Sequence, residues 1–378
     1  MVISIAGLDE RFLNDSRLKI PNIRRMIRTG AAAAGVIGVA PSDTWPSAIA
    51  LVTGVAPAET RASTTLWQAA AKSGLRTASV YWPDTAGAEI GFDFPAGAEP
   101  RKGRDVQFDE VARLAMPAGI ADSIERASPG FEKQLWDDKS AAQAATYILR
   151  NEKPDLTLVQ FTDLEAEQRE TTSMGVYARD TLETEDDLVG QIVAAAPAAT
   201  VIALVSGHGL ENENYVVRPR MLLKQPRRPA ARVPVAVEAG LIGTADPAVA
   251  ERLRRLMKDG HRHGIAREVP ASEVRARASS SLWPDIAHWT AAFDTPANYV
   301  ASADDRGPAL GPGTHHAVSG LWPERPGYRS VFVMSGGGIS ARKLGEVDLL
   351  QVAPTFAEVI GVELPQAKKG SLWAAIAR

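Results

Sequence analysis

The chain contains 378 residues, with 42 Lys and Arg, 45 Asp and Glu, a formal net charge of −3 and no cysteine. This length allows one large core with an insertion, or two cores, and the near balance of charge argues against a nucleic acid polymer as partner. Because cysteine is absent, disulfides, thiolate nucleophiles and cysteine metal sites are excluded. A metal would need His, Asp, Glu or hydroxyl ligands.

No apolar run approaches the roughly 20 residues that cross a bilayer, and the first residues lack the charged segment of an export signal. We therefore expect no membrane span and a cytoplasmic location. An export signal removed beforehand would leave the same start, so the location depends only weakly on the sequence.

Short apolar runs along the chain are typical of buried parallel strands. They are residues 2–7, 77–82, 156–163, 200–209 and 329–336. Charged or Ala-rich stretches with helical spacing separate them; residues 21–30 predict a helix, with Pro21 in its first turn and Gly30 after its end. This alternation predicts an α/β fold whose polar residues gather at the carboxyl ends of the strands.

The composition changes between residues 211 and 312, where Arg and Pro become frequent and strand-like runs become short. A helical stretch at residues 246–260 lies within this segment. We predict that residues 211–312 form an inserted cap, and that residues 1–210 and 313–378 form the core.

Five separated stretches carry a family resemblance. They are "PSDTWPSAIALVTGVAPAE" (41–59), "FTDLEAEQ" (161–168), "VSGHGL" (205–210), "GPGTHH" (311–316) and "VDLLQVAPTFAEVIGVELP" (347–365). Together they resemble the type I phosphodiesterase/nucleotide pyrophosphatase family of the alkaline phosphatase superfamily. The resemblance implies a doubly wound, mostly parallel sheet flanked by helices, with an inserted cap. It also implies a hydrolase of phosphate or related oxyanion esters that uses two divalent metals, usually zinc.

Thr44 takes the position of the family's nucleophile in this resemblance. A hydroxyl attacks phosphorus well only when a metal or a base takes its proton, and the N-terminus of a helix favours the anionic phosphate. Taken alone, Thr44 favours the simpler interpretation of a helix N-cap. The surrounding motif favours the nucleophile.

The resemblance also assigns metal ligands. For one metal it implies Asp163, Glu167 where the family has His, and His315. For the other it implies Thr44 and His208.

At this second metal Ala6 and Gly207 stand where the family has Asp. Loss of two carboxylates should empty the site, so we expect one ion, Zn or Mn, or none. Asp9 and Asp43 are alternative ligands if the loops take a changed path. If positions 6 and 207 form a vacancy, returning Asp to both should raise metal uptake and hydrolysis.

Two functions remain open at this point. The first is a hydrolase of small-molecule phosphoesters or related anionic esters, with weak or altered activity on one metal. The second is a catalytically inactive relative that binds an anionic ligand or acts as a scaffold. The sequence assigns neither the substrate-binding residues nor the oligomeric state.

Overall fold

A computed structural model describes residues 1–96, 108–224, 230–278 and 282–377. Its centre is an eight-stranded sheet in the order β17-β2-β16-β6-β1-β5-β3-β4. The strands are β1 (Val2–Ile5), β2 (Ala31–Ile37), β3 (Thr77–Val80), β4 (Phe92–Phe94), β5 (Leu156–Phe161), β6 (Val201–Val205), β16 (Phe332–Gly336) and β17 (Arg342–Asp348). All neighbours are parallel except at β16, which is antiparallel to both β2 and β6. The sheet therefore confirms the predicted fold class.

The direction of β16 corrects the prediction of a parallel strand at residues 329–336. The short strand β15 (Ala317–Val318) pairs with β7 (Glu211–Asn212), which follows the carboxyl end of β6. The chain therefore returns to the sheet at its carboxyl edge, and the next strand has to run backwards. The sequence analysis also missed β2, which is rich in Ala, and β17, whose alternate residues are polar.

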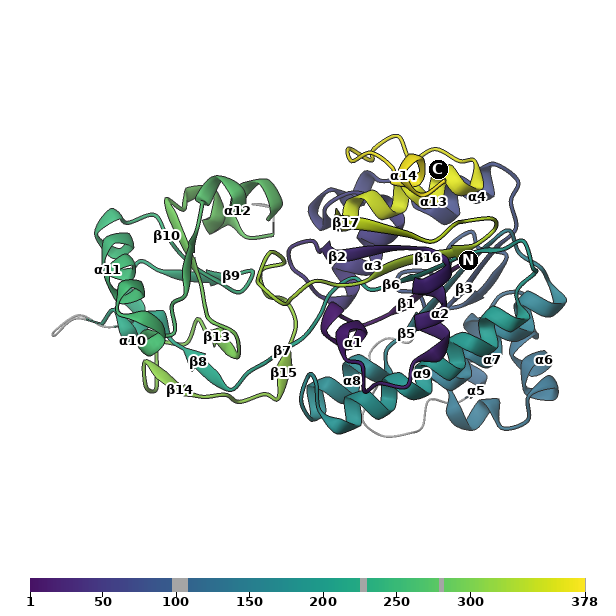
Figure 1. The fold of residues 1–378 in the computed structure, drawn as a ribbon, viewed down its shortest axis with the longest axis horizontal. Helices are drawn as coiled ribbons and strands as arrows, with labels where there is room; N and C mark the ends of the chain where they lie inside the picture. The colour runs from purple at the N-terminus through teal and green to yellow at the C-terminus, as the bar shows by residue number, and fades with distance from the viewer. Residues whose placement is uncertain (97–107, 225–229, 279–281, 378) are drawn as a thin grey trace.

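Helices cover both faces of the sheet (Figure 1). Successive side chains of β1 point to opposite faces of the sheet, so Val2 packs in one apolar cluster while Ile3 and Ile5 pack in the other. The Val2 face carries α3 (Thr44–Thr53), α4 (Leu66–Lys72), α13 (Val352–Ile360) and α14 (Trp373–Ile376). The opposite face carries α1 (Glu10–Asn14), α2 (Pro21–Thr29), α5 (Phe108–Leu114), α6 (Ile120–Ala127), α7 (Asp138–Asn151), α8 (Asp163–Glu170) and α9 (Val176–Ala195). The helix predicted at residues 21–30 is confirmed as α2, which starts on Pro21 and ends before Gly30.

Residues 211–312 add no strand to the eight-stranded sheet within the described ranges, and they lie beside it at the left of Figure 1. They form one sheet of β8 (Tyr215–Val217), β13 (Tyr299–Ala301) and β14 (Leu310–Pro312). A second sheet contains β9 (Ala236–Glu238), β10 (Leu241–Thr244), β11 (Arg267–Val269) and β12 (Ala291–Asp294). The helices here are α10 (Pro219–Leu222), α11 (Pro247–Lys258) and α12 (Ala271–Arg277). One further apolar cluster packs among these elements, and another joins them to Ala40 and Trp322 outside the segment.

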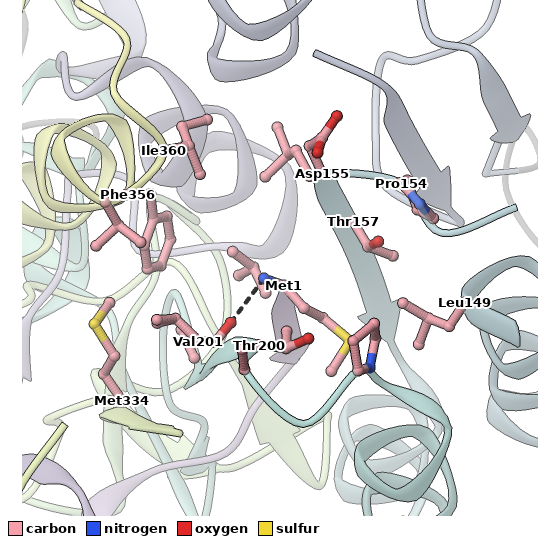
Figure 2. Close-up of a pocket in the computed structure, with 16 residues that line it drawn as sticks. Met1, Leu149, Pro154, Asp155, Thr157, Thr200, Val201, Met334, Phe356 and Ile360 are labelled. Atoms are coloured by element: carbon pink, nitrogen blue, oxygen red, sulfur yellow. Dashed lines mark hydrogen bonds between the residues drawn. The ribbon is translucent and has the colours of Figure 1, made fainter. Parts of the chain in front are cut away.

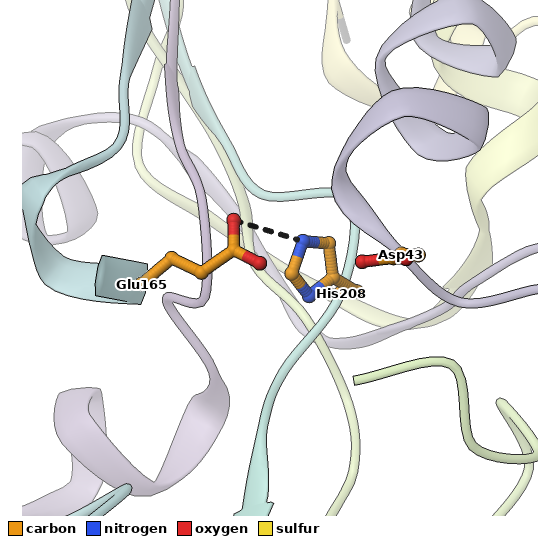
Figure 3. Close-up of side chains that lie close together, drawn as sticks. All are labelled: Asp43, Glu165 and His208. Atoms are coloured by element: carbon orange, nitrogen blue, oxygen red, sulfur yellow. Dashed lines mark ion pairs between the residues drawn. The ribbon is translucent and has the colours of Figure 1, made fainter. Parts of the chain in front are cut away.

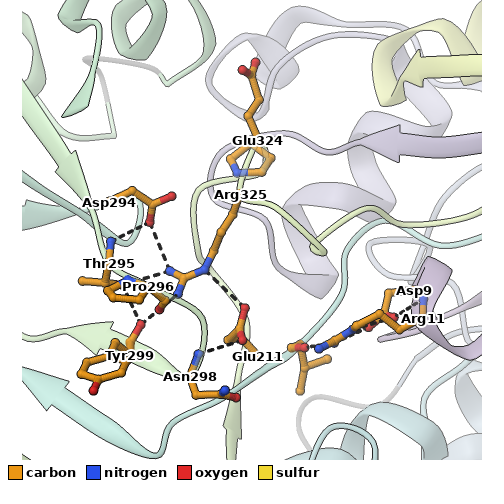
Figure 4. A network of polar contacts seen from close by, with 12 residues as sticks. Asp9, Arg11, Glu211, Asp294, Thr295, Pro296, Asn298, Tyr299, Glu324 and Arg325 are labelled. Carbon is orange, nitrogen blue, oxygen red and sulfur yellow. Dashed lines mark hydrogen bonds and ion pairs between the residues drawn. The ribbon is translucent and has the colours of Figure 1, made fainter. Parts of the chain in front are cut away.

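A buried arginine ties the returning chain to this segment (Figure 4). The Arg325 side chain is only 2% exposed and forms ion pairs with Glu211 at 3.3 Å and Asp294 at 3.2 Å. It also donates to the carbonyls of Pro296 at 2.6 Å and Tyr299 at 3.0 Å. These bonds satisfy the buried charge and fix the loop that precedes β16.

No helix in the described part of the chain is long and apolar enough to cross a membrane.

Candidate active site

The loops that follow β2, β5 and β6 bring three side chains together at the carboxyl edge of the sheet. Thr44 begins α3, Glu165 lies in the first turn of α8, and His208 follows β6. Asp43 caps the start of α3 by accepting the backbone N–H of Thr44 at 3.0 Å. The cap fixes where the helix begins, and so it fixes the position of the Thr44 side chain.

The Thr44 hydroxyl lies between two hydrogen-bond acceptors. It donates to Glu165 Oε2 in a very short hydrogen bond, and His208 Nε2 is 3.1 Å from Oγ1. His208 Nδ1 is 3.2 Å from the Gly209 carbonyl, which can only accept, so we assign the ring proton to Nδ1. Nε2 then presents a lone pair to Thr44. The single hydroxyl proton cannot bond to both acceptors at once. The second acceptor therefore needs either another proton or a cation, and this favours cation binding beside Thr44.

Asp43, Glu165 and His208 are the one group among the described residues that can supply three metal-ligand atoms, all within 4.8 Å of one another (Figure 3). Glu165 and His208 are buried. Two carboxylates and one imidazole suit a divalent ion such as Zn²⁺ or Mn²⁺, and the Thr44 oxygen adjoins the group. The residues present therefore fit one divalent metal.

Arg169 supplies a positive charge to the same group. Its Nη2 donates to Glu165 Oε1 at 2.6 Å, to Ser319 Oγ at 2.6 Å and to Asp43 Oδ1 at 3.2 Å. Ser319 in turn donates to Asp43 Oδ1 at 2.6 Å. Burial raises the pKa of Asp43, but the Ser319 hydroxyl and nearby positive charge outweigh burial and leave the pKa below its ordinary value. Asp43 therefore stays an anion at neutral pH.

The predicted ligands Asp163 and Glu167 lie on the other side of α8 from Glu165. Successive helical residues are about 100° apart, so a side chain two positions away points to the opposite face. Asp163 Oδ2 accepts the backbone N–H of Asp138 at 3.1 Å, and Asp138 Oδ2 accepts that of Asp163 at 3.1 Å. The side chain of Glu167 adds no contact to the group around Thr44 in the described residues. Their assignment as ligands stays a prediction.

Asp163 belongs to a buried cluster of carboxylates with Asp138 and Glu185. Burial, followed by the charge of Asp163, raises the pKa of Asp138 to about 7. Burial and the neighbouring Asp138 also raise the pKa of Glu185. This cluster accepts the first N–H groups of α8 and so anchors the start of the helix that carries Glu165.

His315 pairs with Glu213, the residue that follows β7. Its Nδ1 is 3.3 Å from Glu213 Oε2, and its side chain is 66% exposed. The backbone N–H groups of Thr314 and His315 also donate to Glu213, at 2.6 and 3.2 Å. The structure therefore gives His315 a carboxylate partner outside the Asp43, Glu165 and His208 group.

The two positions that lack a carboxylate are both enclosed by protein, and at Gly207 packing leaves no room for a side chain. Ala6 is buried, and its N–H donates to the Phe161 carbonyl at 2.9 Å. A Cβ on Gly207 would lie 2.2 Å from Ser47 Cβ in α3, far inside van der Waals contact. The expectation that these positions form an open vacancy is thus corrected at Gly207, because Ser47 fills the space.

Of the two alternative ligands, the structure brings Asp43 to the site and holds Asp9 elsewhere. Asp9 is fully buried and paired with Arg11, whose Nε and Nη2 lie 3.0 and 2.6 Å from its two oxygens (Figure 4). Arg11 also donates to the Leu210 carbonyl. Asp9 therefore has a resident partner and is absent from the group around Thr44.

A cavity of about 260 Å³ lies away from this site (Figure 2). Met1, Leu156 and Val201 line it, and these residues stand at the amino ends of β1, β5 and β6. Thr44, Glu165 and His208 lie beyond the carboxyl ends of parallel strands, at the opposite edge of the sheet. The cavity therefore takes no part in the chemistry at Thr44.

Comparison with known proteins fits this geometry. Residues 1–62 and 60–292 match the family model of type I phosphodiesterase/nucleotide pyrophosphatase. This chain belongs to that family. Membership implies dependence on a divalent metal. Among the described residues, the group that can hold such a metal is Asp43, Glu165 and His208.

Solved structures support the fold. Murine ectonucleotide pyrophosphatase/phosphodiesterase 5, an inactive variant in complex with AMP, is similar with a TM-score of 0.61 and 12% identity, covering 99% of this chain and 97% of that one. The human protein is similar with a TM-score of 0.61 and 12% identity, covering 98% and 97%. At this identity the likeness establishes the alkaline phosphatase fold alone. No curated protein matches the sequence.

Sequence reasoning missed Glu165, Arg169 and Ser319. A signal for the first two was present, because Glu165 and Arg169 repeat the four-residue spacing of Asp163 and Glu167, displaced by two positions. Choosing between the two pairs requires knowing which face of α8 meets Thr44. Ser319 follows β15 and carried no motif of its own.

Proposed function

We propose that this family member is a hydrolase of small-molecule phosphoesters in which Thr44 is the nucleophile. The observation that supports this proposal most strongly is the Thr44 hydroxyl, held at the start of α3 between Glu165 Oε2 and His208 Nε2. The N-cap of α3 is Asp43, so capping the helix does not account for the two acceptors around the Thr44 hydroxyl. The helix N-terminus also favours an anionic phosphate beside Thr44.

Glu165 is the nearer proton acceptor in this mechanism. Thr44 Oγ1 forms a bond to phosphorus, its proton passes to Glu165, and the ester oxygen leaves from the far side of the phosphorus. Water then hydrolyses the phosphothreonine and restores the hydroxyl. His208 presents its Nε2 lone pair to Thr44 as a second acceptor, because its Nδ1–H is held by the Gly209 carbonyl. Nucleophile and base in direct contact are the arrangement that activates a hydroxyl.

Asp43, Glu165, His208 and Thr44 would hold the divalent metal. When bound, the metal would stabilise the negative charge of the phosphate as a Lewis acid and favour loss of the Thr44 proton. We propose one such ion, Zn²⁺ or Mn²⁺, because positions 6 and 207 offer no carboxylate and Ser47 closes the space at Gly207. We also propose that residues 211–312 act as a cap beside this edge of the sheet.

The test is hydrolysis of nitrophenyl phosphate monoesters and diesters, together with a nitrophenyl ester of a nucleoside monophosphate, with Zn²⁺ or Mn²⁺ present. The nucleoside ester is included because one similar structure holds AMP. Thr44→Val should lower kcat by about 10³-fold or more, whereas Thr44→Ser should keep measurable turnover. The matched control is Thr53→Val in the last turn of the same helix, where the hydroxyl donates to the Ile49 carbonyl and accepts the backbone N–H of Val55, away from Thr44. Equal rates for the wild type and Thr44→Val would contradict the proposal.

A second candidate is a catalytically inactive protein that binds an anionic ligand. The substitutions at positions 6 and 207 and the tight packing of Ser47 against Gly207 favour it. In that case the wild type binds inorganic phosphate or AMP, turns over no ester in the panel, and gives no phosphothreonine at Thr44 by mass spectrometry.

A further inference from the structure

The contacts of Arg169 differ from those of an ordinary ion pair on a helix surface. An exposed pair four residues apart, as Glu165 and Arg169 would be alone, contributes little to stability. Here the guanidinium also crosses to Ser319 and to Asp43, which precedes Thr44. Three separate segments that border the nucleophile therefore converge on one cation.

The charges around Thr44 define what this cation can do. Asp43 and Glu165 carry two negative charges, and Arg169 cancels one of them. One divalent metal added to this set leaves a net charge of about +1, which favours an anionic phosphate. A second divalent metal has no anionic ligand at Ala6 or Gly207, and the packing of Ser47 leaves no room for a side chain at Gly207.

Part of the Arg169 guanidinium is available to bind a ligand. Nε and Nη2 of Arg169 make the hydrogen bonds to Glu165, Asp43 and Ser319, while Nη1 makes none within the described residues. The Arg169 side chain is 40% exposed. A planar, permanently charged guanidinium with free N–H groups is well suited to phosphate oxygens.

We propose that Arg169 is a resident cation that takes the place of the second divalent metal and binds the phosphate group of the substrate. This inference rests on the proposed function, because it names what holds the substrate at the same site. It predicts two opposite effects of removing the charge. Phosphate binding should weaken, because its cationic partner is gone. Divalent-metal binding should strengthen, because Glu165 and Asp43 no longer pair with Arg169.

The experiment is calorimetric titration of the full chain after removal of metal by chelator, first with inorganic phosphate and separately with Zn²⁺. Arg169→Gln should bind phosphate about tenfold more weakly and Zn²⁺ about tenfold more tightly than the wild type. Arg169→Lys should keep most of the phosphate affinity, because the charge remains. The control is Arg76→Gln, which removes another arginine ion pair, to Glu152 at 3.4 Å, and should change neither affinity.

Unchanged phosphate affinity in Arg169→Gln would overturn the inference, as would unchanged Zn²⁺ affinity. If Arg169→Gln does not fold, Arg169→Lys decides. Retained phosphate binding in Arg169→Lys supports the role of the charge. Phosphate binding as weak as that of a denatured sample contradicts it. A failure of the proposed function can be told apart from a failure of this inference. If Thr44→Val leaves turnover unchanged while Arg169→Gln loses phosphate, the resident cation stands and the nucleophile does not.

Discussion

The two faces of α8 carry carboxylates with contrasting surroundings. On one face Glu165 contacts a hydroxyl, a guanidinium and an imidazole. On the other face Asp163 meets Asp138 in a buried cluster that no cation joins within the described residues, and the pKa of Asp138 is raised to about 7. A carboxylate paired with Arg and Thr is prepared for proton transfer or metal binding, whereas carboxylates that meet only each other and backbone N–H groups hold protons and anchor a helix. Residue type alone does not distinguish these two roles.

The largest expected effect is on kcat, which should depend on the carboxylate of one face of α8 and not on that of the other. Glu165→Gln should lower kcat for phosphoester hydrolysis by about 10²–10⁴-fold, because the amide neither accepts the proton of Thr44 nor binds a metal well. Asp163→Asn should change kcat by less than about tenfold, since its side chain accepts a backbone N–H on the far face of α8 and the amide oxygen can do the same. The measurement is kcat on the nitrophenyl panel. A larger loss of kcat in Asp163→Asn than in Glu165→Gln would indicate that the metal binds on the face of α8 that carries Asp163 and Glu167, as the family motif implies.

The next effect concerns the closed position at Gly207. Gly207→Asp should lower the free energy of unfolding by about 3 kcal/mol or more, because its Cβ would overlap Ser47 Cβ. Ser47→Gly in the same chain should recover part of this loss by making room, beyond its own helix cost of about 1 kcal/mol. Urea unfolding measures both variants.

Gly345→Asp is the control for that experiment, because a Cβ there meets nothing within 4 Å. Full stability of Gly207→Asp, with a second equivalent of metal bound, would show that the vacancy expected from the sequence is open after all.

The smallest effect is a pH dependence from the buried face. Burial raises the pKa values of Asp138 and Glu185, so the folded protein keeps protons that the unfolded chain loses above about pH 4. The free energy of unfolding should therefore fall as pH rises from about 4 through about 7 and beyond.

Glu185→Gln should make this fall shallower and raise stability at about pH 8 by about 1–3 kcal/mol, while its amide oxygen still accepts the N–H of Leu164. The control is Glu183→Gln on the same helix, a half-buried residue whose amide oxygen can still accept the N–H of Lys19. A slope unchanged by Glu185→Gln would show that the cluster is ionised in the folded protein. Urea unfolding across the pH range gives the slopes.

The sequence predicted the fold class and the edge of the sheet where Thr44 and His208 meet, because His208 follows a predicted strand and the family motif puts Thr44 at the start of a helix. It could not choose between Asp163 and Glu165. A shift of two residues in a helix reverses the face, and the choice depends on how α8 packs against α7 and α9. The space filled by Ser47 at Gly207 is likewise a property of packing between α3 and the loop after β6. The reversed β16 follows from the path of the chain through residues 313–328, which carries no strong pattern.

The most direct test of the site is the number of metal equivalents bound by the wild type, Glu165→Gln and Asp163→Asn after purification without chelator. A site made by Asp43, Glu165 and His208 predicts about one equivalent in the wild type and in Asp163→Asn, and little or none in Glu165→Gln. Loss of metal in Asp163→Asn with retention in Glu165→Gln would contradict this account, and so would two equivalents in the wild type.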